Sequence, residues 1–451
     1  MLVDRMKLSG HARWGVVRPT GLRAIGVALV IAASAAAVLF AGPATAASRD
    51  GDNPVSGDGL LSTSVVYGRK WTATFSLNTL ADSNFRRVQD AESALRITPT
   101  IDVGVGMPVG RQQLFIGGEL GRDFVLNHSE FNTGRYAIGG GVAWRVGARC
   151  SGLVGGDYRS RLNQVFEQAG FTPNVQNVTT FAGSASCQTA TGLGFGGSVR
   201  HTDIANERVQ REPFNLRSTV FDPNISYGTP TIGQFSLGAT FNNTVYPFRF
   251  TPTLAGAQQD GVKIFSGRVG YSRNLGSRLQ FSAGASYLKS KPKPDVQLGI
   301  GPGGALIDVP RTDFSGSGFD LSLAYQPSSR MTVDLSASRN VNASANVGAL
   351  FTVTQGYSAN VGYKLSPRLD FSTGVSRLQN DYKESFTSPD EPLKRISDRI
   401  HRIYAQLDYS PVPLYSVGLV VAHQWRNSNP ANFDFKSTTA RLRLTVKFGR
   451  G

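Results

Sequence analysis

Apolar and polar residues alternate along most of this chain with a period of two. In residues 94–121, for example, Ile101, Val103 and Val105 occupy one set of positions, and polar residues or glycine fill the other. About eighteen segments show this pattern, and the i, i+3, i+4 spacing of a helix is nowhere sustained. The pattern predicts antiparallel β-strands with one apolar face and one polar face.

The connections between these segments alternate in length. Tight turns such as VGARC, NLGSR and KLSPR are followed by longer polar connections, which include residues 247–261 and 288–313. Short turns at one end and long loops at the other are typical of an outer-membrane barrel, with the turns in the periplasm and the loops outside the cell. A secreted soluble all-β protein is the alternative, but segments of 10–16 residues are long for sandwich strands.

Aromatic residues recur on the apolar face next to the short turns. Tyr227, Tyr271, Tyr325, Tyr363 and Tyr409 close segments, and Phe235, Phe281, Phe371 and Tyr415 open them. Aromatic girdles of this kind mark the membrane interface of transmembrane barrels. The predicted fold is therefore an all-β, up-and-down transmembrane barrel of about 18 strands, with 16 possible if the weak segment 216–229 is misread.

The N-terminal residues have the features of a secretory signal peptide. Five basic residues precede the apolar run 25–41, and Ala44-Thr45-Ala46 fits a cleavage site. An uncleaved anchor helix is the alternative. We predict a signal peptide at 1–46, a polar periplasmic lead-in at 47–70 and an outer-membrane barrel at 71–451.

The interpretation of the net charge of +16 depends on this predicted location. Cleavage would remove five basic residues and Asp4, which leaves the mature chain with a net charge of +12. A basic protein exported from the cytoplasm is not expected to bind nucleic acid. The excess charge predicts anionic partners such as lipopolysaccharide phosphates, an acidic polymer or small anions.

Cys150 and Cys187 are the two cysteines of the chain, and both lie on outward positions at the periplasmic ends of neighbouring strands. The oxidising periplasm favours a disulfide between them, although a slip in strand register would leave two separate thiols. Two thiols without an adjacent histidine do not predict a metal site. No HExxH, GxSxG or phosphate-binding loop occurs, so neither an enzyme nor a cofactor is predicted.

Inward positions of the predicted barrel carry more basic than acidic residues, and rings of such residues favour anions in a channel. Cross-wall pairing of these cations with inward aspartates is the structural alternative. The predicted lumen-facing set is Arg96, Arg135, Arg145, Arg159, Arg200, Arg268, Arg402, Arg441, Arg443 and Lys447.

A second basic set lies in the predicted loops, where contact with lipopolysaccharide phosphates is expected. It comprises Arg86, Arg87, Lys289, Lys291, Lys293, Lys394 and Arg395. The long segment 289–310 is also a candidate for a loop that constricts the pore.

Residues 77–93 (LNTLADSNFRRVQDAES) followed by RITPTIDVGVG resemble the opening of the putative beta-barrel porin 2 family. Asp82, Ser83, Asn84, Phe85 and Arg86 match its first loop, and Pro99 matches a proline within its second strand. Ala81 stands where the family usually has an aromatic residue. The resemblance implies an outer-membrane barrel, often linked to polysaccharide secretion, and carries no catalytic residues.

Three functions compete at this point. The first is export of an acidic exopolysaccharide, with a periplasmic partner delivering the polymer. The second is general or anion-selective diffusion. The third is a non-transport role, such as an adhesin or an assembly factor.

Overall fold

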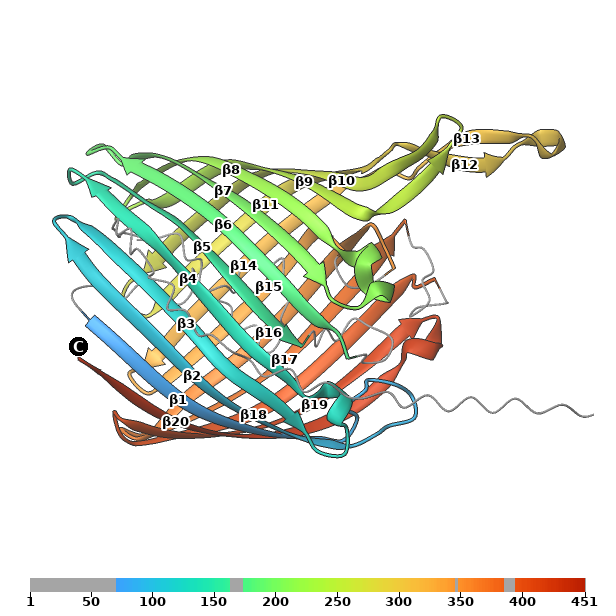
Figure 1. Cartoon of the computed structure of the whole chain (residues 1–451). Coiled ribbons are helices and arrows are strands. Elements are labelled where there is room, and N and C mark those ends of the chain that lie inside the picture. Colours follow the sequence, from blue (N-terminus) through green and yellow to red (C-terminus); the bar gives the residue numbers. More distant parts are fainter. Residues whose placement is uncertain (1–69, 163–172, 345–347, 385–393, 451) are drawn as a thin grey trace, which may run out of the picture. The chain divides into compact units, whose positions relative to one another are not determined.

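The computed structural model describes residues 70–162, 173–344, 348–384 and 394–450. The predicted signal peptide and all of the predicted lead-in except Lys70 lie outside these residues. Eighteen strands form one antiparallel sheet, in which each strand pairs with the next along the chain and β1 pairs with β20 (Figure 1). The predicted closed barrel of 18 strands is confirmed. Segment 216–229 is strand β8, so the 16-stranded alternative is wrong.

The barrel strands have the following bounds: β1 (Lys70–Asp82), β2 (Ala94–Val109), β3 (Gln112–Val125), β4 (Thr133–Val146), β5 (Cys150–Leu162), β6 (Val175–Gln188), β7 (Leu193–Asn206), β8 (Leu216–Thr229), β9 (Gly233–Thr253), β10 (Gly256–Leu275), β11 (Leu279–Lys293), β14 (Phe314–Ser328), β15 (Met331–Ala343), β16 (Phe351–Ser366), β17 (Leu369–Lys383), β18 (Ser397–Val412), β19 (Tyr415–Asn429) and β20 (Phe435–Arg450). Closure leaves no strand edge unpaired, as a hydrocarbon environment requires. Among the described residues, no helix is long and apolar enough to cross a membrane.

One end of the barrel carries the short turns and is called the turn end below. The opposite end is called the loop end. Gly110, Gly147 and Gly276 adopt positive φ in three of the short turns, a conformation that glycine reaches without strain. Short 3₁₀ helices occupy several loop-end connections: η1 (Ser129–Phe131), η2 (Val209–Phe214) and η4 (Ala431–Phe433).

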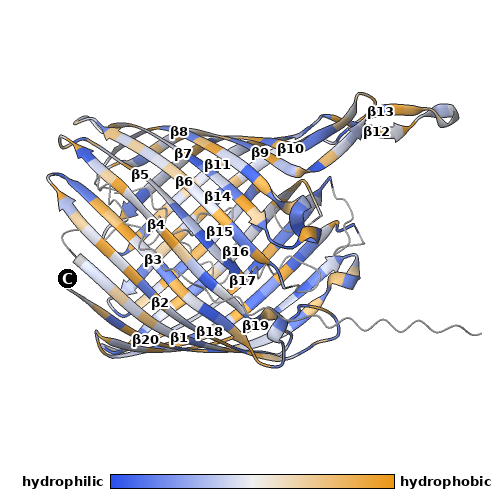
Figure 2. Ribbon diagram, in the orientation of Figure 1, coloured by the Kyte–Doolittle hydropathy of each residue, from blue (hydrophilic) through white to orange (hydrophobic). Residues whose placement is uncertain are grey.

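The two faces of the wall follow the alternation of the sequence (Figure 2). Outward residues such as Ile116 and Ile138 are more than half exposed. The pairing also sets aromatic residues side by side at the turn end, since Phe235 lies opposite both Tyr227 and Tyr271. A band of exposed apolar side chains bordered by aromatic residues suits contact with lipid.

Two connections differ from expectation. Residues 247–261 are not a loop, because β9 continues to Thr253 and β10 begins at Gly256. Within segment 289–310, strands β12 (Val296–Ile300) and β13 (Leu306–Pro310) form a hairpin, with η3 (Pro302–Gly304) at its tip. Figure 1 shows this hairpin beyond the loop end, beside the ends of β9 and β10. It does not constrict the lumen, because its backbone pairs with itself and extends the wall.

Candidate channel lumen

The register places all ten predicted basic residues on the inward face. Neighbouring residues of a strand point to opposite faces, and each basic residue is next to an outward residue. Arg268 precedes Val269, and Lys447 precedes Phe448. Both of these apolar side chains are about half exposed on the outer wall. The residues do not form one ring. They divide between the β20–β1–β2 wall, the β4, β5 and β7 wall, and single positions on β10 and β18.

The closing seam between β20 and β1 holds the densest basic group. Arg441, Arg443 and Lys447 share the inward face of β20. Leu80 of β1 pairs with Arg441 on one side and with Arg96 of β2 on the other. The pairing of β1 with β20 therefore gathers residues from the two ends of the sequence.

Some of the predicted cations are paired across the wall. Arg135 Nε lies 2.6 Å from Glu119 Oε1, and Arg268 binds Asp320. Arg443 Nε donates to Asn78 Oδ1 at 3.0 Å. Within the described part of the chain, no ion pair forms at Arg145, Arg200 or Lys447. Cross-wall pairing thus accounts for part of the set and leaves a positive excess.

A row of serines crosses six neighbouring strands, which the sequence analysis missed. In register, the row comprises Ser272 (β10), Ser282 (β11), Ser322 (β14), Ser336 (β15), Ser358 (β16) and Ser376 (β17). It lies on the inward face and is called the serine row below. Hydroxyls of Ser282 and Ser322, and those of Ser336 and Ser358, are 2.7 Å apart.

The serine row runs obliquely along the lumen, from near the turn end on β10 towards the loop end on β17. Ser272 lies near the turn-end limit of β10 at Leu275, whereas the next residue of the row after Ser376 is Arg402, far from the turn-end limit of β18 at Val412. The rise follows from strand tilt, because hydrogen-bonded rows run oblique to the axis of a barrel. The inner wall therefore carries an oblique band of hydroxyl groups that ends at a guanidinium.

Tyr404 borders this band on the neighbouring row. Its hydroxyl donates to Asn360 Oδ1 at 2.9 Å by crossing Gly374, and the Arg402 guanidinium lies 5.7 Å from its ring centroid. A Cβ at residue 374 would lie 2.7 Å from Tyr404 Cε1. Glycine at this position therefore lets the tyrosine lie flat across β17.

The turn end carries a cavity of about 580 Å³ between the ends of β4 to β9. Its lining includes Arg145, Arg149, Ser226 and Gln234. Gln234 pairs directly with Ser272, the first residue of the serine row. Polar groups thus continue from the rim of the barrel onto the inner wall.

The Cys150–Cys187 pair lies at the same rim. The two residues are directly opposite each other in the β5–β6 register, with Cα atoms 4.1 Å apart, and their sulfurs are bonded. Both share the outward parity of Val154 and Phe181. The bond would join the turn-end limits of two neighbouring strands.

Described residues of the connection between β15 and β16 enter the barrel. Tyr246, on the inward face of β9, donates its hydroxyl towards the backbone oxygens of Ser344 (2.7 Å) and Leu350 (2.9 Å). Leu350, Phe351 and their neighbours pack in one apolar cluster with inward residues of β6 to β11. The sequence offered a weak signal here, since residues 348–353 are apolar where the neighbouring connections are polar.

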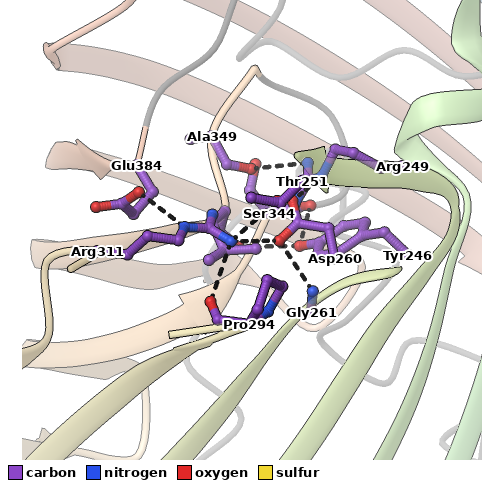
Figure 3. A network of polar contacts seen from close by, with 11 residues as sticks. Tyr246, Arg249, Thr251, Asp260, Gly261, Pro294, Arg311, Ser344, Ala349 and Glu384 are labelled. Carbon is purple, nitrogen blue, oxygen red and sulfur yellow. Dashed lines mark hydrogen bonds and ion pairs between the residues drawn. The ribbon is translucent and has the colours of Figure 1, made fainter. Parts of the chain in front are cut away.

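A buried polar network ties this connection to the wall (Figure 3). Asp260 binds Arg249 and Arg311, the latter at 2.8 Å, and Arg311 Nε lies 3.1 Å from Glu384 Oε2. Arg311 also donates to the oxygens of Thr251 and Pro294. The Arg311 and Asp260 side chains are each 5% exposed, so this network is shielded from water.

A second buried group lies on the inner face of β17 to β19. Arg395 Nη1 is 3.2 Å from Asp398 Oδ2, which also accepts from the Tyr382 hydroxyl at 2.9 Å. Arg426 Nε donates to the Phe433 carbonyl at 2.7 Å. The expectation that Arg87 and Arg395 contact lipopolysaccharide is wrong. Arg395 is fully buried, and Arg87 Nη2 lies 2.7 Å from Asp82 Oδ2 in a largely buried ion pair at the seam.

Within the described residues, no group of three or more His, Cys, Asp or Glu side chains is placed to hold a metal ion. The chemistry that the lumen offers is therefore hydrogen bonding from hydroxyls and charge from guanidinium and ammonium groups.

The carboxy-terminal strands carry the decisive similarity. Residues 303–448 match the model of the Putative beta-barrel porin 2 family. This is the same family that the opening residues resemble, and the match lies in a different part of the chain. The two regions, β1–β2 and β14–β20, meet at the seam between β1 and β20. The closed barrel and the porin 2 match identify a porin-like outer-membrane β-barrel.

Solved structures with similar architecture include the outer membrane protein OpdK of Pseudomonas aeruginosa (TM-score 0.45, 12% identity, covering 84% of this chain and 99% of that one). The Pseudomonas aeruginosa OccK2 complex with glucuronate matches with a TM-score of 0.45 and 11% identity over 84% and 96% of the two chains. The alcaligin outer membrane receptor FauA of Bordetella pertussis matches with a TM-score of 0.43 and 12% identity over 84% and 76%. No curated protein sequence matches the chain.

Proposed function

We propose that this barrel exports an acidic exopolysaccharide across the outer membrane, and that its mature form is produced by removal of a signal peptide. The observation that carries the proposal is the composition of the lumen, whose inner wall carries an oblique row of hydroxyls on β10 to β17 and an excess of basic side chains mainly on other strands. Sugar hydroxyls exchange hydrogen bonds with serines, and guanidinium groups bind carboxylates.

The turn-end cavity is the proposed loading point. Gln234 in its lining leads to Ser272 and hence onto the serine row. In outer-membrane barrels the turn end faces the periplasm, so a periplasmic partner would deliver the polymer here. Weak hydrogen bonds that repeat along the path let a polymer slide, because each sugar unit that leaves one hydroxyl reaches an equivalent hydroxyl on the next strand.

The test is a clean deletion of the gene, complemented by the wild-type barrel or by an Arg441→Glu, Arg443→Glu variant. Export predicts that surface polymer disappears in the deletion strain while precursor accumulates inside the cell. The wild-type gene should restore it, and the variant should not, although the variant still assembles in the outer membrane. Unchanged surface polymer in the deletion strain would contradict the proposal.

Diffusion of small anions is the second candidate, because the β15–β16 connection lies against the inner wall. An inward segment narrows a lumen and suits solutes better than a polymer. In that case the purified barrel conducts small anions in planar bilayers, and the deletion strain keeps its surface polymer.

A further inference from the structure

Four lysines gather on the outward face of β10 and β11 near the loop end. Lys263 shares the parity of outward Val269, and Lys289, Lys291 and Lys293 share that of Tyr287. Lys263 lies directly opposite Lys291 in the register, and Phe265 lies opposite Lys289. These four residues are called the lysine cluster below. Lys263 was absent from the basic set derived from the sequence.

The lysine cluster is electrostatically unbalanced. Like charges directly opposite each other on one face of a β-sheet repel. In the described part of the chain, only Lys291 has a carboxylate partner, Asp313, at 3.5 Å. Both of these side chains are about half exposed. The arrangement is stabilised when an external anion lies among the ammonium groups.

An aromatic row leads up to the lysine cluster along the outer wall. Phe221, Phe241 and Phe265 are in register on β8, β9 and β10, and their ring centroids are 6.4 and 5.3 Å apart. Phe265 then pairs with Lys289. One continuous row of the lipid face therefore passes from three aromatic rings to an ammonium group.

The height of the lysine cluster matches the outer boundary of the hydrocarbon. Phe281 stands at the turn-end girdle of β11, the strand that carries three of the lysines. With a rise of about 2.5 Å per residue along the membrane normal, Lys289 and Lys291 lie about 20 and 25 Å above Phe281. The apolar band of such barrels is about 25 Å tall, so the ammonium groups lie where outer-leaflet headgroups begin.

We infer that the lysine cluster and the aromatic row together form a binding site for a phosphorylated acyl lipid of the outer leaflet, lipid A. Its phosphates would lie among Lys263, Lys289 and Lys291, and its acyl chains along Phe221, Phe241 and Phe265. Lysine binds phosphate as a compact, mobile point charge and needs no fixed bidentate geometry. The site lies on the lipid face, so it does not depend on what crosses the lumen.

The test compares the full-length, detergent-purified barrel with a Lys263→Gln, Lys289→Gln, Lys291→Gln variant. Binding of bisphosphorylated lipid A is measured beside binding of dephosphorylated lipid A. The variant is expected to bind bisphosphorylated lipid A about 100-fold more weakly, since each of the three lysines near a charged surface contributes roughly a fivefold effect. Dephosphorylated lipid A should bind both proteins alike.

Two further variants keep the test decisive. Replacing Arg278, Arg330 and Arg368 with Gln removes the same charge from exposed residues of the short turns, and it should leave lipid A binding unchanged. Replacing the three lysines with Arg should retain binding within a few-fold, which separates lost charge from lost folding. Equal binding by wild type and the Gln variant would overturn the inference. Displacement of lipid A by a soluble acidic polysaccharide at equal charge would also overturn it.

Discussion

At the residue scale, Gly374 determines how Tyr404 lies in the lumen. The Tyr404 side chain crosses β17 at Gly374 to reach Asn360, because no Cβ blocks its path. The inner wall at this point is therefore shaped by the absence of a side chain.

We predict that Gly374→Ala breaks the Tyr404–Asn360 hydrogen bond and lowers the free energy of unfolding by about 1–3 kcal/mol, because the added methyl overpacks the site. Urea unfolding of the barrel in lipid vesicles measures this change. Gly356→Ala is the matched control, since its Cβ would make only ordinary contact, 3.6 Å from Leu378. Equal stabilities of the two variants would contradict the prediction.

The disulfide is also a residue-scale expectation, and the register supports it. We predict that Cys150 and Cys187 resist alkylation until the denatured protein is reduced. In the Cys150→Ser, Cys187→Ser variant the free energy of unfolding should fall by about 2–4 kcal/mol. The reason is that the cysteines are 37 residues apart in sequence, and the unfolded chain between them is no longer closed into a loop. Full labelling of both thiols without a reductant would exclude the bond.

At the element scale, the β15–β16 connection and the ends of β9 and β10 are held together by buried charge. Glu384 is compensated by Arg311, and Asp260 is compensated by both Arg311 and Arg249. Breaking a buried ion pair is costly because the remaining charge has no water to solvate it. The loop end is therefore held in place where these buried ion pairs form.

We predict that Arg311→Met destabilises the barrel by about 3–5 kcal/mol and exposes the loop end to proteases, since it leaves Glu384 without its cation and Asp260 with Arg249 alone. Limited proteolysis of the folded protein locates the change. Lys291→Met is the control, because it breaks the exposed pair with Asp313, whose contribution is at most about 1 kcal/mol. If both variants were cleaved alike, burial would not be the cause.

At the scale of the whole molecule, closure of the barrel produces the charge distribution of the lumen. Arg96 and Arg441 are far apart in sequence, yet both pair with Leu80. The seam therefore presents a local positive field to the lumen, and such a field favours anions.

We predict that the open barrel prefers anions, and that an Arg441→Gln, Arg443→Gln, Lys447→Gln variant loses much of this preference. Reversal potentials in a salt gradient measure the selectivity. The Lys263, Lys289 and Lys291 to Gln variant is the control, because it removes equal charge from the lipid face. A cation-selective wild-type barrel would contradict the prediction.

The sequence by itself determined the fold class, because period-two alternation is repeated in every strand and each strand shows it locally. It also placed Arg268 and Lys447 on the inward face, since parity along one strand needs no partner. Strand register, by contrast, depends on hydrogen bonds between segments, and one residue of slip changes every neighbour. The serine row and the lysine cluster exist only in that register. The inward β15–β16 connection and the burial of Arg87 and Arg395 were decided by tertiary packing. The carboxylates that compensate these two arginines, Asp82 and Asp398, are close in sequence. The aromatic rings that cover the arginines, Phe435 and Phe433, are distant in sequence and come near only in the closed barrel.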